Sequence, residues 1–135
     1  MRRQDHGFLV GHGPARIAVI TRRIYAPQRR GPRSAIQIDR HGRLRRGYGI
    51  KFITVVDRTH PDALRLTARD LRRGLPLRLF PHFADDTGAA AVIPPAGSGR
   101  SRSVPGGVFV PGPGCYELAY RAPGVDERIV FAATF

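Results

Sequence analysis

The sequence holds a single cysteine, no tryptophan and only one lysine among its 135 residues. The lone cysteine, Cys115, cannot form an intramolecular disulfide. A single cysteine also excludes a structural zinc site with two or more cysteine ligands. A chain of this length still buries about two-thirds of the surface that its unfolded form exposes, so a core can form without cross-links. The size therefore predicts one domain held together by apolar packing.

Long hydrophobic runs are also missing. The longest clean apolar run is "IVFAATF" at 129–135, whereas a membrane-spanning helix needs about 20 such residues. Near the start the only apolar stretch is "FLV", against the about 7–15 residues of a signal peptide. We expect no transmembrane segment, and a cytoplasmic protein if Met1 is the true start. If the start codon is mis-assigned and an export signal precedes it, we expect an extracytoplasmic protein.

Acidic residues are scarce: 10 Asp and Glu stand against 23 Lys and Arg, which gives a net charge of +13. The excess is concentrated at 1–50, while 104–135 carries slightly more acids than bases. Such a charge predicts binding to a polyanion such as a nucleic acid. Lys51 is the only lysine, however, and a preference for Arg with abundant Gly and Pro is equally typical of a GC-rich genome. Charge alone therefore leaves both interpretations open.

What the sequence does contain is a repeated alternation of apolar and polar residues, bounded by Gly and Pro. The segments that we predict to be strands are 15–24, 33–39, 49–56, 63–71, 75–80, 115–121 and 125–135, with 89–93 and 107–110 as weaker edge candidates. Within 63–71, apolar residues at every second position favour a strand over the helix that Pro61 could begin. Many short strands with turn signals between them predict an all-β sandwich or barrel.

The predicted organisation is simple. Residues 1–14 form an N-terminal tail, and 15–135 form one β-sandwich domain. The segment "PPAGSGRSRSVPGG" at 94–107 is poor in apolar residues and rich in Ser, Gly and Pro, which is typical of a long surface loop.

The last hairpin carries the most specific local pattern. Gly114-x-Tyr116-x-Leu118 has the parity of the tyrosine corner of immunoglobulin domains, where a Tyr precedes a buried residue by two positions. We expect Tyr116 to bury its ring and to bond its hydroxyl to nearby backbone, with Leu118 in the place of a disulfide cysteine. The pattern predicts an immunoglobulin-like antiparallel β-sandwich of about 7–8 strands.

Cys115 could be a nucleophile only with a base within about 3 Å. The histidines lie in separate segments, at positions 6, 12, 41, 60 and 82. A free cysteine is commonly a small buried hydrophobe, so we predict a structural role for Cys115, as for Tyr116 and Leu118. No Ser-His-Asp spacing and no GxSxG motif occur. We expect no catalytic residues, no metal and no cofactor; a hydrolase is a third, weaker hypothesis.

One cluster of cations is a candidate anion-binding site. The arginines Arg40, Arg43, Arg45 and Arg46 lie close together in the sequence, next to Tyr48. Guanidinium groups match phosphate oxygens in pairs, and an aromatic ring can stack on a base. The alternative interpretation is a solvated turn between two strands.

The segment "VPGPGCYELAYRAPGVDERIVFAATF" at 110–135 resembles the C-terminal motif of uncharacterised secreted proteins of actinobacteria and related bacteria. In that family a Pro-Gly-Cys-Tyr/Trp segment leads into a final hairpin. "GHGPARIAVI" and "GYGIKFITVVD" are similar to its first strand and its core. The resemblance implies an exported immunoglobulin-like sandwich with no known activity. This chain has Phe52 and Ile53 where the family commonly has a Trp.

Two functional hypotheses follow. The first is a non-enzymatic, extracytoplasmic binding, accessory or adhesion module with a protein or envelope partner. The alternative is a basic β-domain that binds nucleic acid or another polyanion.

Overall fold

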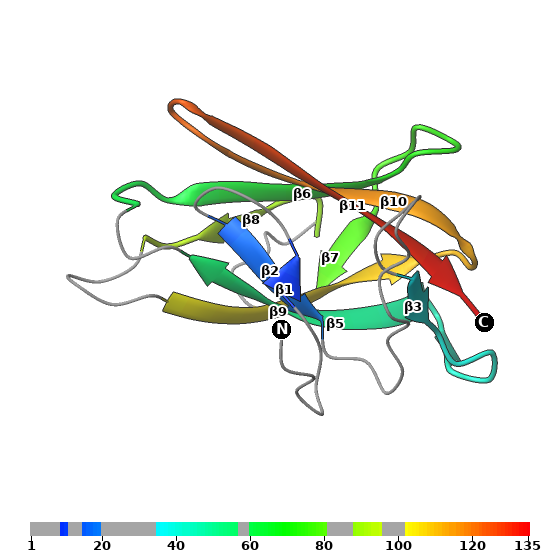
Figure 1. Ribbon diagram of the computed structural model, residues 1–135. Helices are drawn as coiled ribbons and strands as arrows, with labels where there is room; N and C mark the ends of the chain where they lie inside the picture. Colours follow the sequence, from blue (N-terminus) through cyan, green and yellow to red (C-terminus); the bar gives the residue numbers. More distant parts are fainter. Residues whose placement is uncertain (1–8, 11–14, 20–34, 57–59, 81–87, 96–101) are drawn as a thin grey trace.

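The computed structural model describes residues 9–10, 15–19, 35–56, 60–80, 88–95 and 102–135. Every regular element in these segments is a β-strand, and the strands form two layers, as Figure 1 shows. The predicted all-β sandwich is thus confirmed. Among the described residues no helix is long and apolar enough to cross a membrane.

The first sheet is antiparallel throughout. Its strand order is β1 (Leu9–Val10), β2 (Ala15–Val19), β5 (Gly47–Val56), β9 (Arg102–Val110) and β7 (Arg78–Phe80), and β4 (Arg43–Leu44) also pairs with β5. The long strands β5 and β9 pair with each other and form the central part of the lower layer in Figure 1.

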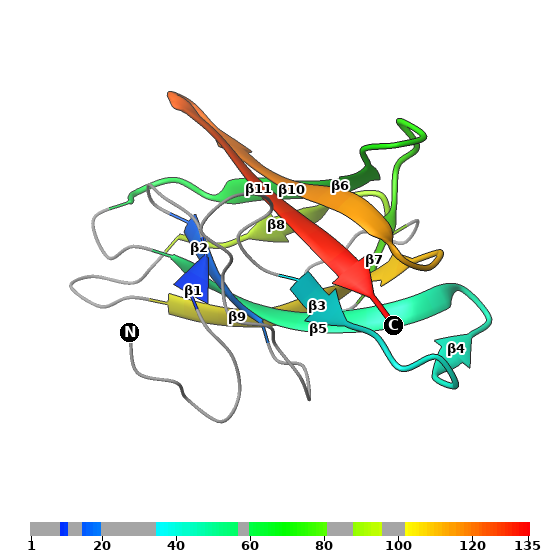
Figure 2. The ribbon, with the colours of Figure 1, turned by 45° about the vertical axis from the view of Figure 1, so that its right-hand side comes forward.

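The second sheet covers the first. Its order is β3 (Ala35–Gln37), β11 (Val125–Thr134), β10 (Gly114–Ala122), β6 (Leu64–Asp70) and β8 (Ala91–Ile93). All pairs are antiparallel except β3 with β11, which is parallel. The tip of the β10–β11 hairpin rises away from the two layers of the sandwich (Figures 1 and 2).

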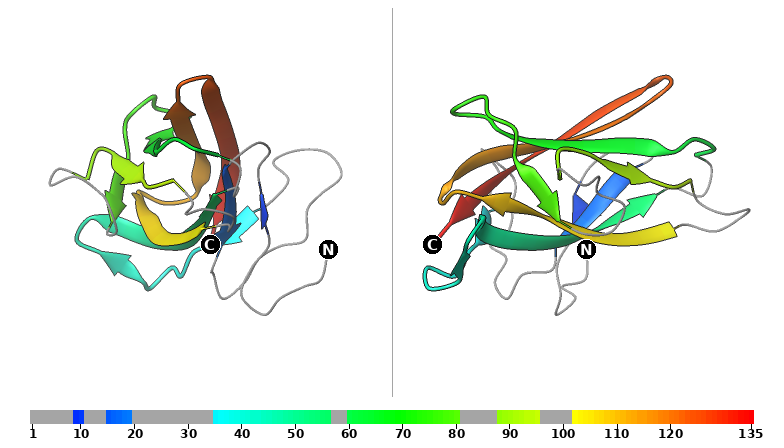
Figure 3. Two further views of the ribbon diagram at one scale, coloured as in Figure 1. Left: turned by 90° about the vertical axis from the view of Figure 1, so that its left-hand side faces the viewer. Right: turned by 180° about the vertical axis from the view of Figure 1, so that it is seen from behind.

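The core lies between the two sheets, because alternate residues of the long strands point inward. In β6 the residues Leu64, Leu66 and Ala68 are buried, as their alternation predicts. In β10, Leu118 and Tyr120 are fully buried against them. Figure 3 shows the two layers end-on and from behind.

The first sheet differs from its sequence prediction at β9. The segment 107–110 was expected to be a weak edge strand, yet β9 begins at Arg102 and lies inside the sheet, between β5 and β7. The predicted loop at 94–107 therefore ends before residue 102. Pro105, Gly106 and Gly107 break the apolar alternation, which hides the strand in the sequence.

Two short strands were not predicted. β1 lies within the segment assigned to an N-terminal tail, and β4 lies within the arginine cluster. Strands of two residues carry no periodicity to detect. With them the described residues contain eleven strands, more than the about 7–8 expected of an immunoglobulin-like sandwich.

Candidate functional site

The predicted arginine cluster forms a projecting hairpin. Arg43 pairs with Tyr48 across β4 and β5, and Arg45 and Arg46 occupy the turn between the two strands. All three arginines are exposed. Gly47 follows the turn with a φ of 117°, and a Cβ there would lie 2.6 Å from the carbonyl oxygen of Val110. Only glycine lets the hairpin cross β9 this closely.

Arg40 lies beside the hairpin and is held by aromatic rings. Its guanidinium carbon is 5.0 Å from the centroid of the Phe135 ring. Phe135 in turn meets the edge of Tyr48 at a centroid distance of 5.5 Å. Cations over aromatic faces gain about 0.5–1 kcal/mol at exposed sites. Figure 2 shows the C-terminus at the same end of the molecule as the β4–β5 hairpin, and the contact with Phe135 places Arg40 at that end as well.

The hairpin has little negative charge to balance it. No ion pair among the described residues involves Arg40, Arg43, Arg45 or Arg46. The nearby carboxylate of Asp39 accepts a hydrogen bond from the backbone N–H of His41 at 2.9 Å, which closes the turn before β4. The cluster is therefore a set of exposed cations that have no ion-pair partner in the described part of the chain.

The structure places the three predicted structural residues differently. Tyr116 and Leu118 are buried, and the Tyr116 hydroxyl donates to the carbonyl oxygen of Gly112 at 2.5 Å. Cys115, by contrast, is exposed, so the expectation of a buried hydrophobe is wrong. Alternation turns Cys115 away from the core once Tyr116 points inward, and no described element covers the outer face at that level.

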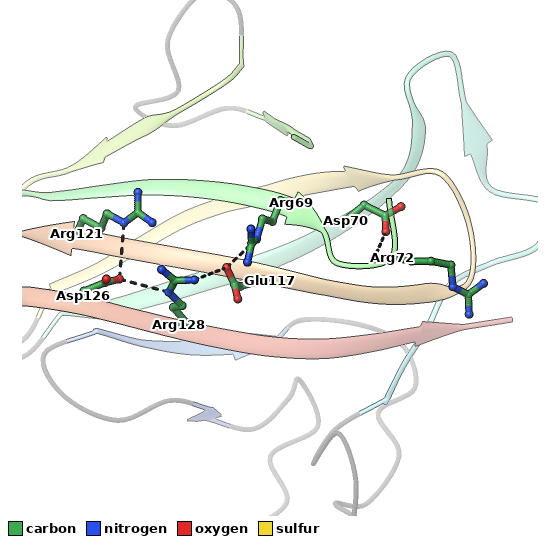
Figure 4. Close-up of polar contacts among 7 residues, drawn as sticks. All are labelled: Arg69, Asp70, Arg72, Glu117, Arg121, Asp126 and Arg128. Atoms are coloured by element: carbon green, nitrogen blue, oxygen red, sulfur yellow. Dashed lines mark hydrogen bonds and ion pairs between the residues drawn. The ribbon is translucent and has the colours of Figure 1, made fainter. Parts of the chain in front are cut away.

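A second charged site lies on the outer face of the second sheet. Arg69 of β6 donates from its Nε to the Oε1 of Glu117 at 3.1 Å. Nη1 of Arg128 lies 3.7 Å from the same oxygen. Asp126 contacts Nε of Arg128 at 3.5 Å and Nε of Arg121 at 3.6 Å. Figure 4 shows this chain of contacts, which we call the charged ridge: Arg69, Glu117, Arg128, Asp126 and Arg121.

Strand register explains the ridge. Glu117 stands directly opposite Arg69 on β6, and Arg128 lies one same-face step away on β11. The Glu117 side chain is only 8% exposed. A carboxylate removed from water in this way must be compensated by cations and hydrogen bonds. The two arginines supply that compensation and are held in place by it.

A shallow groove of about 290 Å³ runs along the ridge. Three arginines and several small residues line it. The lining comprises Thr67, Ala68, Arg69, Gly74, Pro76, Glu117, Ala119, Arg121 and Arg128. The groove is therefore lined with hydrogen-bond donors and is open along its length.

The turn after β6 forms one end of this groove. Asp70 is buried, and its Oδ1 accepts from the backbone N–H groups of Arg72 at 2.9 Å and Arg73 at 3.2 Å (Figure 4). Gly74 completes the turn with a φ of 67°. These bonds are internal, so Asp70 fixes the shape of the groove without adding a free charge to it.

Sequence reasoning did not find the ridge. Arg69 and Glu117 are 48 residues apart, and only the pairing of β6 with β10 brings them together. Alternation does indicate that Arg69, Glu117 and Arg121 point away from the core. Searches of protein-family models, of curated proteins and of solved structures each found no match to this chain. The function must therefore be argued from these two surfaces.

Proposed function

We propose that this protein is a non-enzymatic β-sandwich module that binds a protein or envelope partner outside the cytoplasm. The observation that carries the proposal is the charged ridge on the outer face of the second sheet. Its side chains are fixed by one another on three paired strands, and rigid arrays of donors lose little entropy when a partner binds. An open, shallow groove suits a macromolecular surface better than an enclosed reacting group.

The corner at Tyr116 supports assignment of the sandwich to the immunoglobulin-like type. Its hydroxyl reaches back four residues to Gly112, and it stands at the start of the first strand of the last hairpin. That placement is the one found at the corner of immunoglobulin domains. Domains of this architecture serve many binding functions, so the fold supports a binding role without specifying the partner.

Location can be tested on Cys115, the only cysteine in the chain, because its side chain is exposed. The protein is expressed from its own gene with the native upstream DNA, and intact cells are treated with a membrane-impermeant maleimide. We expect labelling without rupture of the cytoplasmic membrane, and none in Cys115→Ser. Labelling only after that membrane is broken would contradict the proposal.

A second candidate function is polyanion binding by the β4–β5 hairpin. The specific observation is that Arg40, Arg43, Arg45 and Arg46 have no ion pair among the described residues. Cations that neutralise phosphates release counterions from the nucleic acid, and this release drives binding.

Salt dependence tests this candidate. If the four arginines each neutralise one phosphate, their replacement by Gln should reduce the slope of log K against log salt by about 3.6 on duplex DNA. A matched variant with Arg65, Arg72, Arg73 and Arg78 replaced by Gln loses the same charge from other exposed positions. Equal effects of the two variants would mean that only net charge matters, and would reject the hairpin as a site.

A further inference from the structure

We propose that the groove along the charged ridge binds an extended acidic segment of a partner protein, with a carboxylate at every second residue. The inference rests on the proposed role as a binding module and names the chemistry of its partner. It uses the described strands β6, β10 and β11 alone.

The spacing of the arginines carries the proposal. Glu117 stands opposite Arg69, and two residues further along β10, Ala119 stands opposite Arg128. Two residues beyond that lies Arg121 itself. Measured along β10, the three arginines are therefore two residues apart, and across the sheet they lie on three neighbouring strands, Arg69 on β6, Arg121 on β10 and Arg128 on β11. Same-face side chains of an extended peptide repeat every about 6.6 Å, which equals the component of this spacing along the strand.

All three arginines retain donors for a ligand, because Arg128 contacts its acidic partners only through Nε and Nη1. The side chains of Arg69 and Arg121 are 49% and 56% exposed, and both contact their acidic partners through Nε. In Figure 4 the terminal nitrogens of Arg121 point away from Asp126. A guanidinium group carries five N–H donors, so contact at Nε leaves donors for a second carboxylate. Bidentate pairing of that kind is both strong and directional.

The groove also fits a peptide in shape. Thr67 and Ala119 pair with each other across β6 and β10 and line the groove, together with Gly74 and Pro76. These side chains are small and leave room for a main chain to lie along β10. Because Glu117 already holds Arg69 and Arg128 in place, binding orders few new side chains.

Charge balance favours a peptide over a nucleic acid. Within the ridge, Glu117 and Asp126 oppose three arginines, so the net charge is small. Nucleic acids are held chiefly by uncompensated cations that displace counterions. Discrete carboxylates need instead a few donors at defined positions, and the ridge offers these.

The test uses a fluorescein-labelled peptide of four Glu-Thr repeats, titrated with the full chain by fluorescence anisotropy at low salt. An isomer with four contiguous glutamates has the same charge but the wrong spacing. We expect the alternating peptide to bind more tightly. Replacing Arg69 and Arg121 by Gln should weaken its binding about tenfold. The matched variant Arg43→Gln with Arg46→Gln loses the same charge from the hairpin and should change binding less than about twofold.

Four results would overturn the proposal: no binding of the alternating peptide, equal binding of the isomer, an equal loss in the hairpin variant, or tighter binding of a single-stranded oligonucleotide of equal charge that is lost when Arg69 and Arg121 are replaced by Gln. Arg121→Gln alone guards against misfolding, since Arg121 contacts only the exposed Asp126 within the ridge, and it should weaken binding about threefold. Maleimide labelling of Cys115 reports location independently, so failure of either experiment can be told from failure of the other.

Discussion

Tyr116 and Tyr120 lie four positions apart in β10 and point into the same core. The Tyr120 hydroxyl shares a 2.9 Å hydrogen bond with Thr54 of the first sheet, so it links the two layers. Burial raises the pKa of both tyrosines, and the negative charge of Asp70 raises that of Tyr116 further. Both hydroxyls therefore stay protonated across the neutral range and keep their bonds.

This pair predicts a loss of stability in alkali. An unfolded tyrosine ionises near its ordinary pKa of 10.0, whereas the folded pKa is higher. The stabilisation is full below pH 10 and falls as pH rises further, by up to about 1.4 kcal/mol per pH unit for each tyrosine. Urea denaturation at a series of pH values from about 8 to about 11.5 measures this loss of stability.

Tyr120→Phe is the variant that isolates one of the two groups. It should be less stable than the native chain at pH 8 by about 1–3 kcal/mol, because Thr54 loses its buried partner. Its stability should then fall less steeply above pH 10. An unchanged slope would show that Tyr120 does not contribute to the alkaline loss.

At the scale of elements, the β10–β11 hairpin depends on a two-residue turn. Ala122 pairs with Val125, which leaves Pro123 and Gly124 between them. Gly124 has a φ of 73°. Proline followed by a residue of positive φ is the pattern of a type II turn. The turn sets the β10–β11 register that brings Arg128 next to Glu117, so this half of the ridge depends on it.

Gly124→Ala should therefore destabilise the protein by about 1 kcal/mol, although no atom lies within 4 Å of the added Cβ, because the strain is in the backbone. Gly112 is the matched control: it also has open space around it and no positive φ. Gly112→Ala should be neutral or slightly stabilising. Thermal unfolding of the two variants compares them, and equal costs would contradict the argument.

The strand β9 depends on a glycine for a different reason. A Cβ at Gly107 would lie 2.0 Å from the ring of Phe80, which packs against the sheet beside Phe109 at a centroid distance of 4.7 Å. Gly107→Ala should cost about 1–3 kcal/mol through overpacking. In a Phe80→Ala background the same change should cost much less. A double-mutant cycle with no coupling energy would show that the ring moves aside freely.

At the scale of the whole molecule, repulsion between the excess positive charges destabilises the compact folded state. The net charge is +13, and self-repulsion of this kind destabilises a folded state. The four ion pairs found among the described residues all lie on the second sheet. The arginines of the hairpin have no such partners, so their repulsion is relieved mainly by salt.

We expect the unfolding temperature to rise with sodium chloride, because screening shortens the reach of each charge from about 30 Å at 0.01 M to about 10 Å at 0.1 M. Relief of about 1 kcal/mol raises the midpoint by about 4 °C in a domain of this size. The variant with Arg40, Arg43, Arg45 and Arg46 replaced by Gln should show a smaller rise. A midpoint that falls with salt would mean that ion pairs outweigh the repulsion.

Much of the fold was predictable because it depends on local periodicity. The alternation in 63–71 correctly predicted β6, and that in 115–121 and 125–135 predicted β10 and β11. Only residues 107–110 of β9 were predicted, because Pro105 and Gly107 have a low preference for strands. Tertiary packing of Phe80 against Gly107 outweighs that low preference. The exposure of Cys115 was missed because alternation gives the direction of a side chain but not what covers it.

The sequence by itself determined that this chain forms a β-sandwich. Apolar residues at every second position lie on one face of a strand, and packing two sheets face to face buries them. The sequence also brought the four arginines of the cluster close together, because they are neighbours along the chain. Only the tertiary structure decided the charged ridge, because its residues come from strands far apart in sequence. Which charges face one another across a sheet depends on strand order and register, and these are set by the packing of the whole core.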